Sequence, residues 1–380
     1  MSDRRIRLFV VGCSLSVGGA ERFTSTLLSH IDRSRFELIL CLLRNDISYP
    51  IPNDIPVKVL GKYRPWHMWR TIWRLRYFIE QIRPDIVLST SSFVTRITGV
   101  ALWRSSVQPN WVARIGGNSS AEDQGFYKLW HNIIYSRVNE FVANSCGVAE
   151  DFAKIYSFAA GRIRVVGNPT DFAYIDQMAA ESAAYRHKDE IPLIVSVGRL
   201  NKYKRCDLLI DAFARVRKRM PAMLWICGDG PMRERLVKDI AGRDFGDSVK
   251  FFGFQKNPYA LMRQATLFVM TSDREGLPNA LIEAQGLGIP AVSTRCHYGP
   301  DEIIEEGKTG LLIEVGDATA VAKAIETLLM DPKRCEAMGK AARERTRQLY
   351  DHSILIGQWE EFLSKTMQKH APCYSDSCKT

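Results

Sequence analysis

Two acidic side chains, Glu275 and Glu283, lie with seven residues between them in the segment EGLPNALIE. The turn before Asn279 would feed a helix, whose N-terminus presents free N–H groups and a positive dipole end that suit an anion such as phosphate. Glu283, about one turn into that helix, could accept hydrogen bonds from paired hydroxyls such as those of a ribose, and Glu275 could meet a sugar. The same residues also fit an ordinary strand–helix unit with two surface acids.

The residues around these acids predict the elements that would position them. The apolar run 267–270 is typical of a buried parallel strand, and the polar stretch 272–278, with its Gly and Pro, predicts a turn. A helix is expected from Asn279, and residues 289–292 open a second strand. Both acids would therefore follow the carboxyl end of a parallel strand, where doubly wound sheets bind ligands.

Two cations, Arg199 and Lys204, follow another predicted strand, 193–197. Five residues apart across a loop, they could converge on one diphosphate, with Arg acting as a fork and Lys as a point charge. A solvated surface pair is the alternative that the spacing leaves open. Because the chain has no D-x-D motif in a strand-end loop and no metal-type histidine spacing, we expect no metal and no cofactor, and fixed cations would stabilise a departing phosphate.

A glycine pair, Gly18 and Gly19, comes between the predicted strand 6–11 and a helix that follows. Glycines at such a helix start let the backbone approach a ligand closely, although a plain tight turn has the same pattern. The segment is not the G-x-G-x-x-G fingerprint of dinucleotide-binding proteins.

Two series of alternating strands and helices predict an α/β protein of two doubly wound, Rossmann-like domains that face a cleft. The expected domains are residues 1–170 and 191–352, joined by a linker at 171–190. A C-terminal helix at 353–369 is expected to cross back to the first domain, and the tail 370–380 is expected to be disordered.

The composition is that of an ordinary globular protein, 46% hydrophobic and 25% charged over 380 residues. Nine scattered cysteines argue against a disulfide framework. No apolar run approaches the roughly 18–20 residues that span a bilayer. Residues 1–170 hold 22 Lys and Arg against 13 Asp and Glu, whereas residues 171–380 hold 30 against 29. The first half is therefore the part expected to meet an anionic partner or surface.

An aromatic and basic segment in this half predicts a helix with two stripes at about 100° per residue. The expected core face holds Trp69, Ile72, Leu75, Ile79 and Ile82. The second stripe holds Trp66, Trp73 and Tyr77, flanked by Arg70 and Arg74. Such a stripe fits contact with anionic membrane headgroups, or packing against a neighbouring helix. No recognition motif accompanies it, so nucleic acid is not an expected partner.

The order E-G-L-P-N-A-L-I-E-A-x-x-x-G-x-P closely resembles the donor-binding signature of retaining glycosyltransferases of family 4 (glycosyl transferases group 1), of the bacterial polysaccharide and O-antigen type. The segment G-G-A-E-R after Gly18 and the segment G-R-L-x-x-x-K after Val197 resemble two further family segments. The resemblance extends from Leu8 to about Trp359 and is stronger in the second domain.

The resemblance implies catalytic roles for Arg199, Lys204 and Glu275 and the ribose role for Glu283. The other donor-binding positions that it implies are Gly18, Gly19, Phe252, Gly253, Phe254, Gly276, Leu277, Pro278 and Asn279. Relatives retain the anomeric configuration through a same-face substitution with an oxocarbenium-like transition state, so Glu275 is not expected to act as the nucleophile that retaining hydrolases use.

One departure concerns the acceptor side. Many relatives have a His in a first-domain loop, where this chain reads ARIGGN, and Arg114 or Asn118 could take that role. Asn144 is a further expected polar residue of the cleft.

The resulting hypothesis is that the chain is a nucleotide-sugar glycosyltransferase, peripheral on the cytoplasmic face of the inner membrane. Its expected acceptor is a polyprenyl-diphosphate-linked saccharide. A UDP-hexose or UDP-N-acetylhexosamine is the expected donor. A soluble acceptor, or a non-catalytic role as a nucleotide-sugar-binding partner, is the alternative.

Overall fold

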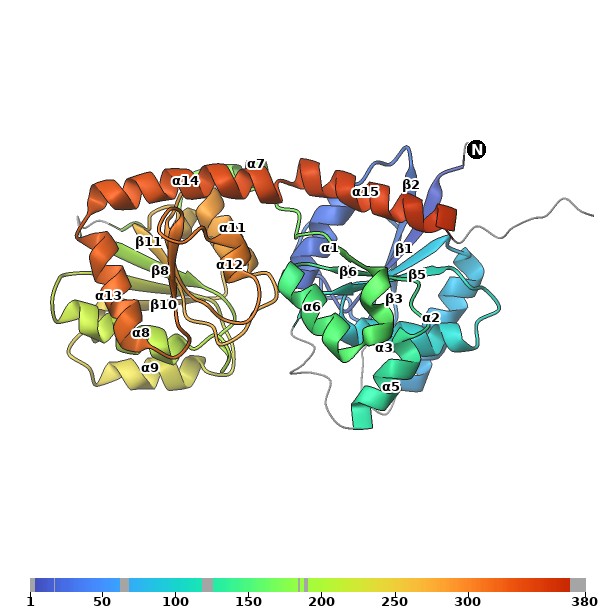
Figure 1. Ribbon diagram of the computed structural model, residues 1–380, viewed down its shortest axis with the longest axis horizontal. Helices are drawn as coiled ribbons and strands as arrows, with labels where there is room; N and C mark the ends of the chain where they lie inside the picture. The colour runs from blue at the N-terminus through green and yellow to red at the C-terminus, as the bar shows by residue number, and fades with distance from the viewer. Residues whose placement is uncertain are drawn as a thin grey trace, which may run out of the picture. The chain divides into compact units, whose positions relative to one another are not determined.

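The computed structural model describes residues 4–16, 18–61, 68–117, 126–183, 185–187 and 191–369 (Figure 1). The chain divides into two compact units. Unit 1 comprises Met1–Asn144, Ala149–Pro169 and Ser353–Thr380, and unit 2 comprises Ser145–Val148 and Thr170–His352. The described residues do not include Trp66, Asn118 or the tail 370–380, for which the sequence analysis made predictions.

Unit 1 is built on a seven-stranded parallel sheet of order β3-β2-β1-β4-β5-β6-β7. Its strands are β1 (Ile6–Gly12), β2 (Phe36–Leu42), β3 (Val57–Val59), β4 (Ile86–Ser89), β5 (Asn110–Ile115), β6 (Glu140–Ala143) and β7 (Ile163–Val165). The central strands are apolar on both faces, as in the buried run Leu8–Val11, because helices cover both sides of a parallel sheet.

The strand order fixes which helices share a face of this sheet. The helices are α1 (Gly19–His30), α2 (Met68–Ile82), α3 (Ser92–Trp103), α5 (Phe126–Tyr135), α6 (Cys146–Ile155) and α15 (His352–Lys369), with a 3₁₀ turn η2 (Ser157–Arg162). The chain moves from β1 to β2 through α1, and in the opposite direction from β3 onward. Because such crossovers are right-handed, α1 covers one face and α2, α3, α5 and α6 cover the other.

The expected C-terminal helix is α15, and it packs beside α1 in unit 1. The rings of Phe23 and Trp359 lie 5.1 Å apart. Glu360 accepts a hydrogen bond from the backbone N–H of Asp32 at 2.8 Å and pairs with Arg35 at 2.9 Å. These contacts join the last described helix to the first βαβ unit of the chain.

The expected core face of α2 was wrong at Trp69, which is 62% exposed. The buried side chains of this helix are Thr71, Leu75 and Ile79. At about 100° per residue, Trp69 points about 120° away from Leu75, whereas Thr71 points only about 40° away. The buried stripe is therefore narrower than the one drawn from hydrophobicity, and Trp69 lies nearer to Trp73.

Unit 2 contains a six-stranded parallel sheet of order β10-β9-β8-β11-β12-β13. Its strands are β8 (Leu193–Val197), β9 (Met223–Cys227), β10 (Val249–Gly253), β11 (Leu267–Met270), β12 (Ala291–Thr294) and β13 (Gly310–Ile313). Its helices are α7 (Phe172–Ala180), α8 (Cys206–Arg217), α9 (Arg233–Ala241), α10 (Tyr259–Met262), α11 (Asn279–Gly286), α12 (Pro300–Ile303), α13 (Ala318–Leu329) and α14 (Pro332–Tyr350), with a 3₁₀ turn η3 (Gly246–Ser248).

The expectation of two parallel-sheet α/β domains is thus confirmed. In unit 2 the chain direction across the sheet reverses between the neighbours β8 and β11. Ligands of doubly wound sheets bind outside the carboxyl ends of the strands at such a switch point. The loops that leave β8 and β11 carry the acids and cations singled out in the sequence. Among the described helices, none is long and apolar enough to cross a bilayer.

Candidate active site

The centre of the site is a contact between the loops that follow β8 and β11. Lys204 Nζ donates to Glu275 Oε1 at 2.5 Å, and Ser272 Oγ donates to the same oxygen at 2.6 Å. The Lys204 side chain is partly exposed and that of Glu275 is mostly buried. A cation and an acid that are 71 residues apart in the sequence therefore form one charged pair.

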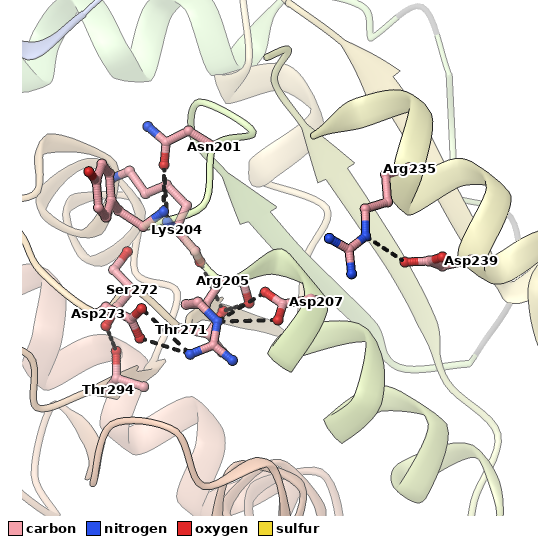
Figure 2. Close-up of polar contacts among 11 residues, drawn as sticks. Asn201, Lys204, Arg205, Asp207, Arg235, Asp239, Thr271, Ser272, Asp273 and Thr294 are labelled. Carbon is pink, nitrogen blue, oxygen red and sulfur yellow. Dashed lines mark hydrogen bonds and ion pairs between the residues drawn. The ribbon is translucent and has the colours of Figure 1, made fainter. Parts of the chain in front are cut away.

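Backbone hydrogen bonds hold these two loops together (Figure 2). Asn201 Oδ1 accepts from the backbone N–H groups of Tyr203 and Lys204 at 3.0 and 3.2 Å, which closes the first loop on itself. Thr271 Oγ1 donates to the carbonyl of Arg205 at 2.8 Å, and the N–H of Asp273 donates to the carbonyl of Tyr203 at 2.8 Å. The position of Lys204 is thus set by the strand beside its own.

Arg205 forms two further ion pairs next to the Lys204–Glu275 pair. Its φ of 48° places it in the left-handed region just before α8, a conformation that a non-glycine residue adopts only where its surroundings stabilise it. Its guanidinium reaches Asp207 at 3.1 Å and Asp273 at 3.1 Å (Figure 2). Hydrogen bonding to the Asp207 carboxylate, together with the charges of both acids, raises the pKa of Arg205.

The turn that carries Glu275 is supported from the next strand. Thr294 Oγ1, at the end of β12, donates to the carbonyl of Ser272 at 2.6 Å. Gly299 approaches the turn from the other side, with a φ of 95°, and a Cβ on it would lie 2.6 Å from the carbonyl oxygen of Gly276. Only glycine fits a position with that φ and that close an approach.

The helix that begins after this turn is α11, and it starts at Asn279 as expected. Its N-cap residue, Pro278, has no side chain that can cap the first N–H groups. Leu277 and Glu283 are buried, and Asn279 is partly exposed at the first position of the helix. The helix N-terminus and the following acid therefore lie in the order that the sequence predicted.

Arg199, the other predicted cation, is exposed in the loop after β8. Within the part of the chain that the structure describes, its side chain has no ion pair or hydrogen bond, in contrast to Lys204. Both side chains leave the same loop, but only Lys204 is held by a protein carboxylate.

Three of the expected donor-binding residues, Phe252, Gly253 and Phe254, lie at and just after the end of β10. The ring of Phe252 packs against Trp225 at 5.0 Å and Tyr185 at 5.8 Å, so its side chain belongs to an aromatic cluster of the fold. Gly253 has a φ of 66°, and its carbonyl accepts from the N–H of Gly228 at 2.8 Å. Phe254 is exposed.

In unit 1 the glycine pair lies at the start of α1. Gly18 is the N-cap residue, with a φ of 150°, and Gly19 is exposed at the first helical position. A Cβ on Gly18 would collide with the carboxylate of Glu21. That carboxylate is the far end of a flexible side chain that can move aside, so the φ of 150°, which residues other than glycine rarely adopt, is the stronger reason for glycine here.

Arg114, at the carboxyl end of β5, is buried. Its Nη2 donates to Asn168 Oδ1 at 2.6 Å, and its Cζ lies 4.3 Å from the centre of the Phe23 ring. Burial lowers the pKa of this guanidinium to about 10, and the charge of Glu21 partly offsets that effect, so Arg114 stays a cation at neutral pH. Asn168 follows β7, 54 residues after Arg114, so this pairing depends on how the strand ends are arranged in the sheet.

Asn144 ends β6 close to this cation in the sheet, because β5 and β6 are paired neighbours. It is buried, and within the described residues its Oδ1 has no hydrogen-bond partner. A buried amide oxygen without a partner is costly. Arg114 and Asn144, two of the residues expected on the acceptor side, therefore lie at the carboxyl ends of two neighbouring strands of the unit 1 sheet.

The aromatic stripe of α2 faces outward. Trp73 is 66% exposed and Tyr77 is 51% exposed, so the alternative that these rings pack under a neighbouring helix is wrong. The guanidinium of Arg70 lies 5.2 Å from the centre of the Trp69 ring, and Arg74 Nη1 donates to the carbonyl of Leu60 at 2.7 Å.

Comparisons with known families cover both units. Residues 17–174 match the family described as Glycosyltransferase Family 4. Residues 177–345 match the family described as Glycosyl transferases group 1.

Curated relatives and a solved structure agree with these matches. The N-acetylgalactosamine-N,N'-diacetylbacillosaminyl-diphospho-undecaprenol 4-alpha-N-acetylgalactosaminyltransferase of Campylobacter jejuni is 27% identical over 88% of this chain and 93% of its own length. The lipopolysaccharide core biosynthesis glycosyltransferase LpsE of Rhizobium meliloti is 31% identical over 57% of this chain and 59% of its own length. The crystal structure of Anabaena HepE with UDP-glucose superposes with a TM-score of 0.80, at 19% identity, over 95% of this chain and 100% of HepE.

The two family matches leave only the ends of the chain and two residues between them uncovered. The likeness to the HepE structure concerns the fold, which has the same two-unit arrangement of elements in sequence over 95% of this chain. The chain therefore belongs to the family 4 glycosyltransferases, also described as glycosyl transferases group 1.

Proposed function

We propose that this glycosyltransferase moves a sugar from a UDP-hexose or UDP-N-acetylhexosamine to a polyprenyl-diphosphate-linked saccharide, with retention of the anomeric configuration and without a metal. The pathway would be the synthesis of a bacterial surface polysaccharide such as O-antigen, capsule or exopolysaccharide. The names of the Campylobacter and Rhizobium relatives support the acceptor class and the pathway. The UDP-glucose complex of HepE supports the donor class.

The observation that carries the proposal is the Lys204–Glu275 pair at the carboxyl ends of β8 and β11. Charge develops on the leaving diphosphate when the bond between the anomeric carbon and the phosphate oxygen breaks, and the electron pair stays on that oxygen. Lys204, held in place by Glu275, supplies a fixed positive charge for that anion, and the exposed Arg199 on the same loop supplies a second charge that the donor itself would have to order. A preorganised charge such as that of Lys204 needs no reorganisation at the moment of reaction.

The acceptor hydroxyl would attack the same face of the sugar that the diphosphate leaves, and its proton would pass to the departing phosphate oxygen. No protein nucleophile takes part in this step. Glu275 fits such a role poorly in any case, because Oε1 already accepts hydrogen bonds from Lys204 and Ser272. Its part is to hold Lys204 and to line the position of the donor sugar.

Glu283 would bind the ribose hydroxyls from the first turns of α11. Its side chain is buried, and a carboxylate accepts strong hydrogen bonds from hydroxyl donors. The open N-terminus of the same helix would meet the phosphates. The backbone of Gly276, Leu277, Pro278 and Asn279 would line the sugar.

Two features of unit 1 support a lipid-linked acceptor at the cytoplasmic face of the inner membrane. The first is the net positive charge of residues 1–170. The second is the outward-facing stripe of Trp73 and Tyr77 beside Arg70 and Arg74. Arg114 and Asn144 would contribute polar groups on the acceptor side.

The proposal is tested by transfer to a defined acceptor. The purified protein is incubated with labelled nucleotide sugars and a short polyprenyl-diphosphate saccharide, and the product is digested with an α- or a β-specific glycosidase. We expect transfer from one UDP-sugar to give a product that only the α-specific enzyme cleaves. Transfer to the free saccharide at the same rate would favour the soluble-acceptor alternative, and a β-linked product would contradict retention from an α-linked donor.

A further inference from the structure

Most of the exposed large apolar side chains among the described residues of unit 1 lie on three helices, α2, α3 and α5. Besides the α2 stripe, Trp103 on α3 is 45% exposed, and Leu129 and Trp130 on α5 are 59% and 47% exposed. These helices follow one another on the same side of the sheet, because the chain crosses from β3 through β6 in one direction. α2 packs on α3, and α3 packs on α5, as Figure 1 shows.

This three-helix face, formed by α2, α3 and α5, carries almost no negative charge. Its basic residues are Arg70, Arg74, Arg76, Arg96 and Lys128. The one acid within the three helices is Glu80, and it is paired with Arg76 at 2.9 Å. The face is thus both cationic and apolar.

Cations and indoles are paired at two places on this face. The Arg70 guanidinium lies 5.2 Å from the centre of the Trp69 ring, and the Arg137 guanidinium, just after α5, lies 5.3 Å from that of Trp103. At the level of lipid headgroups, an indole can bury its ring among the upper acyl chains while the adjacent guanidinium binds phosphate. The two pairs lie on α2 and at the junction of α3 with α5, so the pattern is not confined to one helix.

We propose that the three-helix face is the surface by which this protein docks on a bilayer of anionic phospholipids. Trp69, Trp73, Trp103 and Trp130 would enter the interfacial layer, and Arg70, Arg137 and Lys128 would contact lipid phosphates. The proposal deepens the proposed function and rests on it only for the source of the anionic surface, the cytoplasmic leaflet. The observations favour a bilayer over a protein partner for two reasons. The charged residues of the face are almost all basic, and its exposed aromatic rings are spread over three helices instead of lining one pocket.

The test is sedimentation of the full-length protein with vesicles of phosphatidylcholine alone or mixed with phosphatidylglycerol. We expect binding to the anionic vesicles that weakens as salt is added. The double variant Arg70→Glu and Lys128→Glu should weaken the partition by roughly fivefold or more for each residue. The double variant Trp73→Ser and Trp130→Ser should weaken it by at least about tenfold.

Matched controls come from exposed residues elsewhere. Ile354→Ser changes an exposed side chain of α15, and Lys340→Glu reverses an exposed charge on α14. Both should bind vesicles like the unchanged protein. Brominated lipids should quench tryptophan fluorescence in the control variants, and less in Trp73→Phe, Trp103→Phe and Trp130→Phe.

Several results would overturn the proposal. They are equal binding to neutral and anionic vesicles, unchanged binding of the face variants, and absence of vesicle binding. If light scattering instead shows a dimer that the same variants dissociate, without vesicle binding, the face joins two copies of the chain. Hydrolysis of the nucleotide sugar is measured in parallel on every variant. Donor turnover without vesicle binding refutes only the docking face, whereas vesicle binding without any donor recognition refutes only the proposed function.

Discussion

At the scale of single residues, Lys204 is constrained more tightly than its place in a loop would indicate. Its side chain contacts Glu275, its own N–H is bound by Asn201, and its carbonyl accepts from Thr271 at 3.2 Å. Side chains that act on developing charge work best when they need not be reoriented. The two flanking residues, Asn201 and Thr271, are therefore positioning residues for this cation.

The first prediction concerns the charge of Lys204. Lys204→Met should lower the rate of UDP release from the donor by about 100-fold or more, because one fixed charge is lost from the leaving group. Lys202→Met is the matched control, because Lys202 leaves the same loop and stacks on the Tyr203 ring at 4.9 Å instead of meeting Glu275. Equal rates for both variants would show that the charge of Lys204 does not contribute to the reaction.

The second prediction isolates the contact of Glu283 with a ribose. The unchanged protein should bind UDP about 10-fold more tightly than 2′-deoxy-UDP, since a charged hydrogen bond contributes about 1.5–3 kcal/mol. In Glu283→Ala the two nucleotides should bind alike, as measured by calorimetric titration. A preference for UDP that survives the substitution would place the ribose elsewhere.

At the scale of elements, the β11–α11 turn depends on a neighbouring loop. Gly299, with its positive φ, lies so close to Gly276 that a Cβ there would also meet Leu277 Cα at 3.1 Å. The position of Glu275 therefore depends on a residue 24 positions later that touches no ligand in this account.

The third prediction compares two glycines that share a positive φ. Gly299→Ala should destabilise the protein by about 2–3 kcal/mol and weaken donor binding, since it adds a collision to the backbone cost. Gly307→Ala, with a φ of 76° and no atom within 4 Å of the added Cβ, should cost only about 1 kcal/mol and leave donor binding unchanged. Denaturant unfolding and UDP titration measure both effects, and equal losses would contradict the close approach.

Helix α2 shows what hydrophobic spacing predicts and where it stops. The spacing left two alternatives open for Trp73 and Tyr77, a surface stripe or a contact with a neighbouring helix, and the exposure of both side chains decides between them. Trp69 was wrongly placed in the core, since an apolar side chain at the border of a stripe can lie on either side of it. The width of the buried stripe of α2 depends on how the helix packs on the sheet, and the hydrophobic spacing of the helix does not contain that information.

At the scale of the whole molecule, strand order accounts for most of what the sequence alone could not supply. The apolar runs predicted the strands, and the alternation of elements predicted two parallel sheets. The contact between Lys204 and Glu275 follows only from β8 and β11 being neighbours. Likewise, the bond between Arg114 and Asn168 follows from the arrangement of strand ends, because no local pattern links residues 54 apart.

The fourth prediction uses buried thiols on both units. Burial raises the pKa of the Cys41, Cys206, Cys227 and Cys296 thiols from 9.0 to about 12. Their folded pKa exceeds the unfolded one, so their contribution to stability is complete below about pH 9 and is lost as the pH rises toward about 12. Each thiol should reduce the free energy of unfolding by about 1.4 kcal/mol per pH unit in that window.

Urea unfolding at about pH 8 and about pH 10 checks this dependence. The double variant Cys206→Ala and Cys227→Ala should start from lower stability but lose less between the two pH values. Cys146→Ala, at an exposed thiol, is the control and should keep the slope of the unchanged protein. Identical slopes in all three proteins would show that the buried thiols do not set it.

The most direct test of the central claim, that unit 2 binds and activates a nucleotide sugar, is a panel of UDP- and GDP-sugars. Thermal shift and slow nucleotide release are read for the purified protein and for Lys204→Met. The account predicts that one UDP-sugar stabilises the protein and is slowly hydrolysed, and that Lys204→Met abolishes the hydrolysis. Absence of a shift with every nucleotide sugar and nucleoside diphosphate would contradict the claim, whereas a shift without hydrolysis would favour a non-catalytic nucleotide-sugar-binding partner.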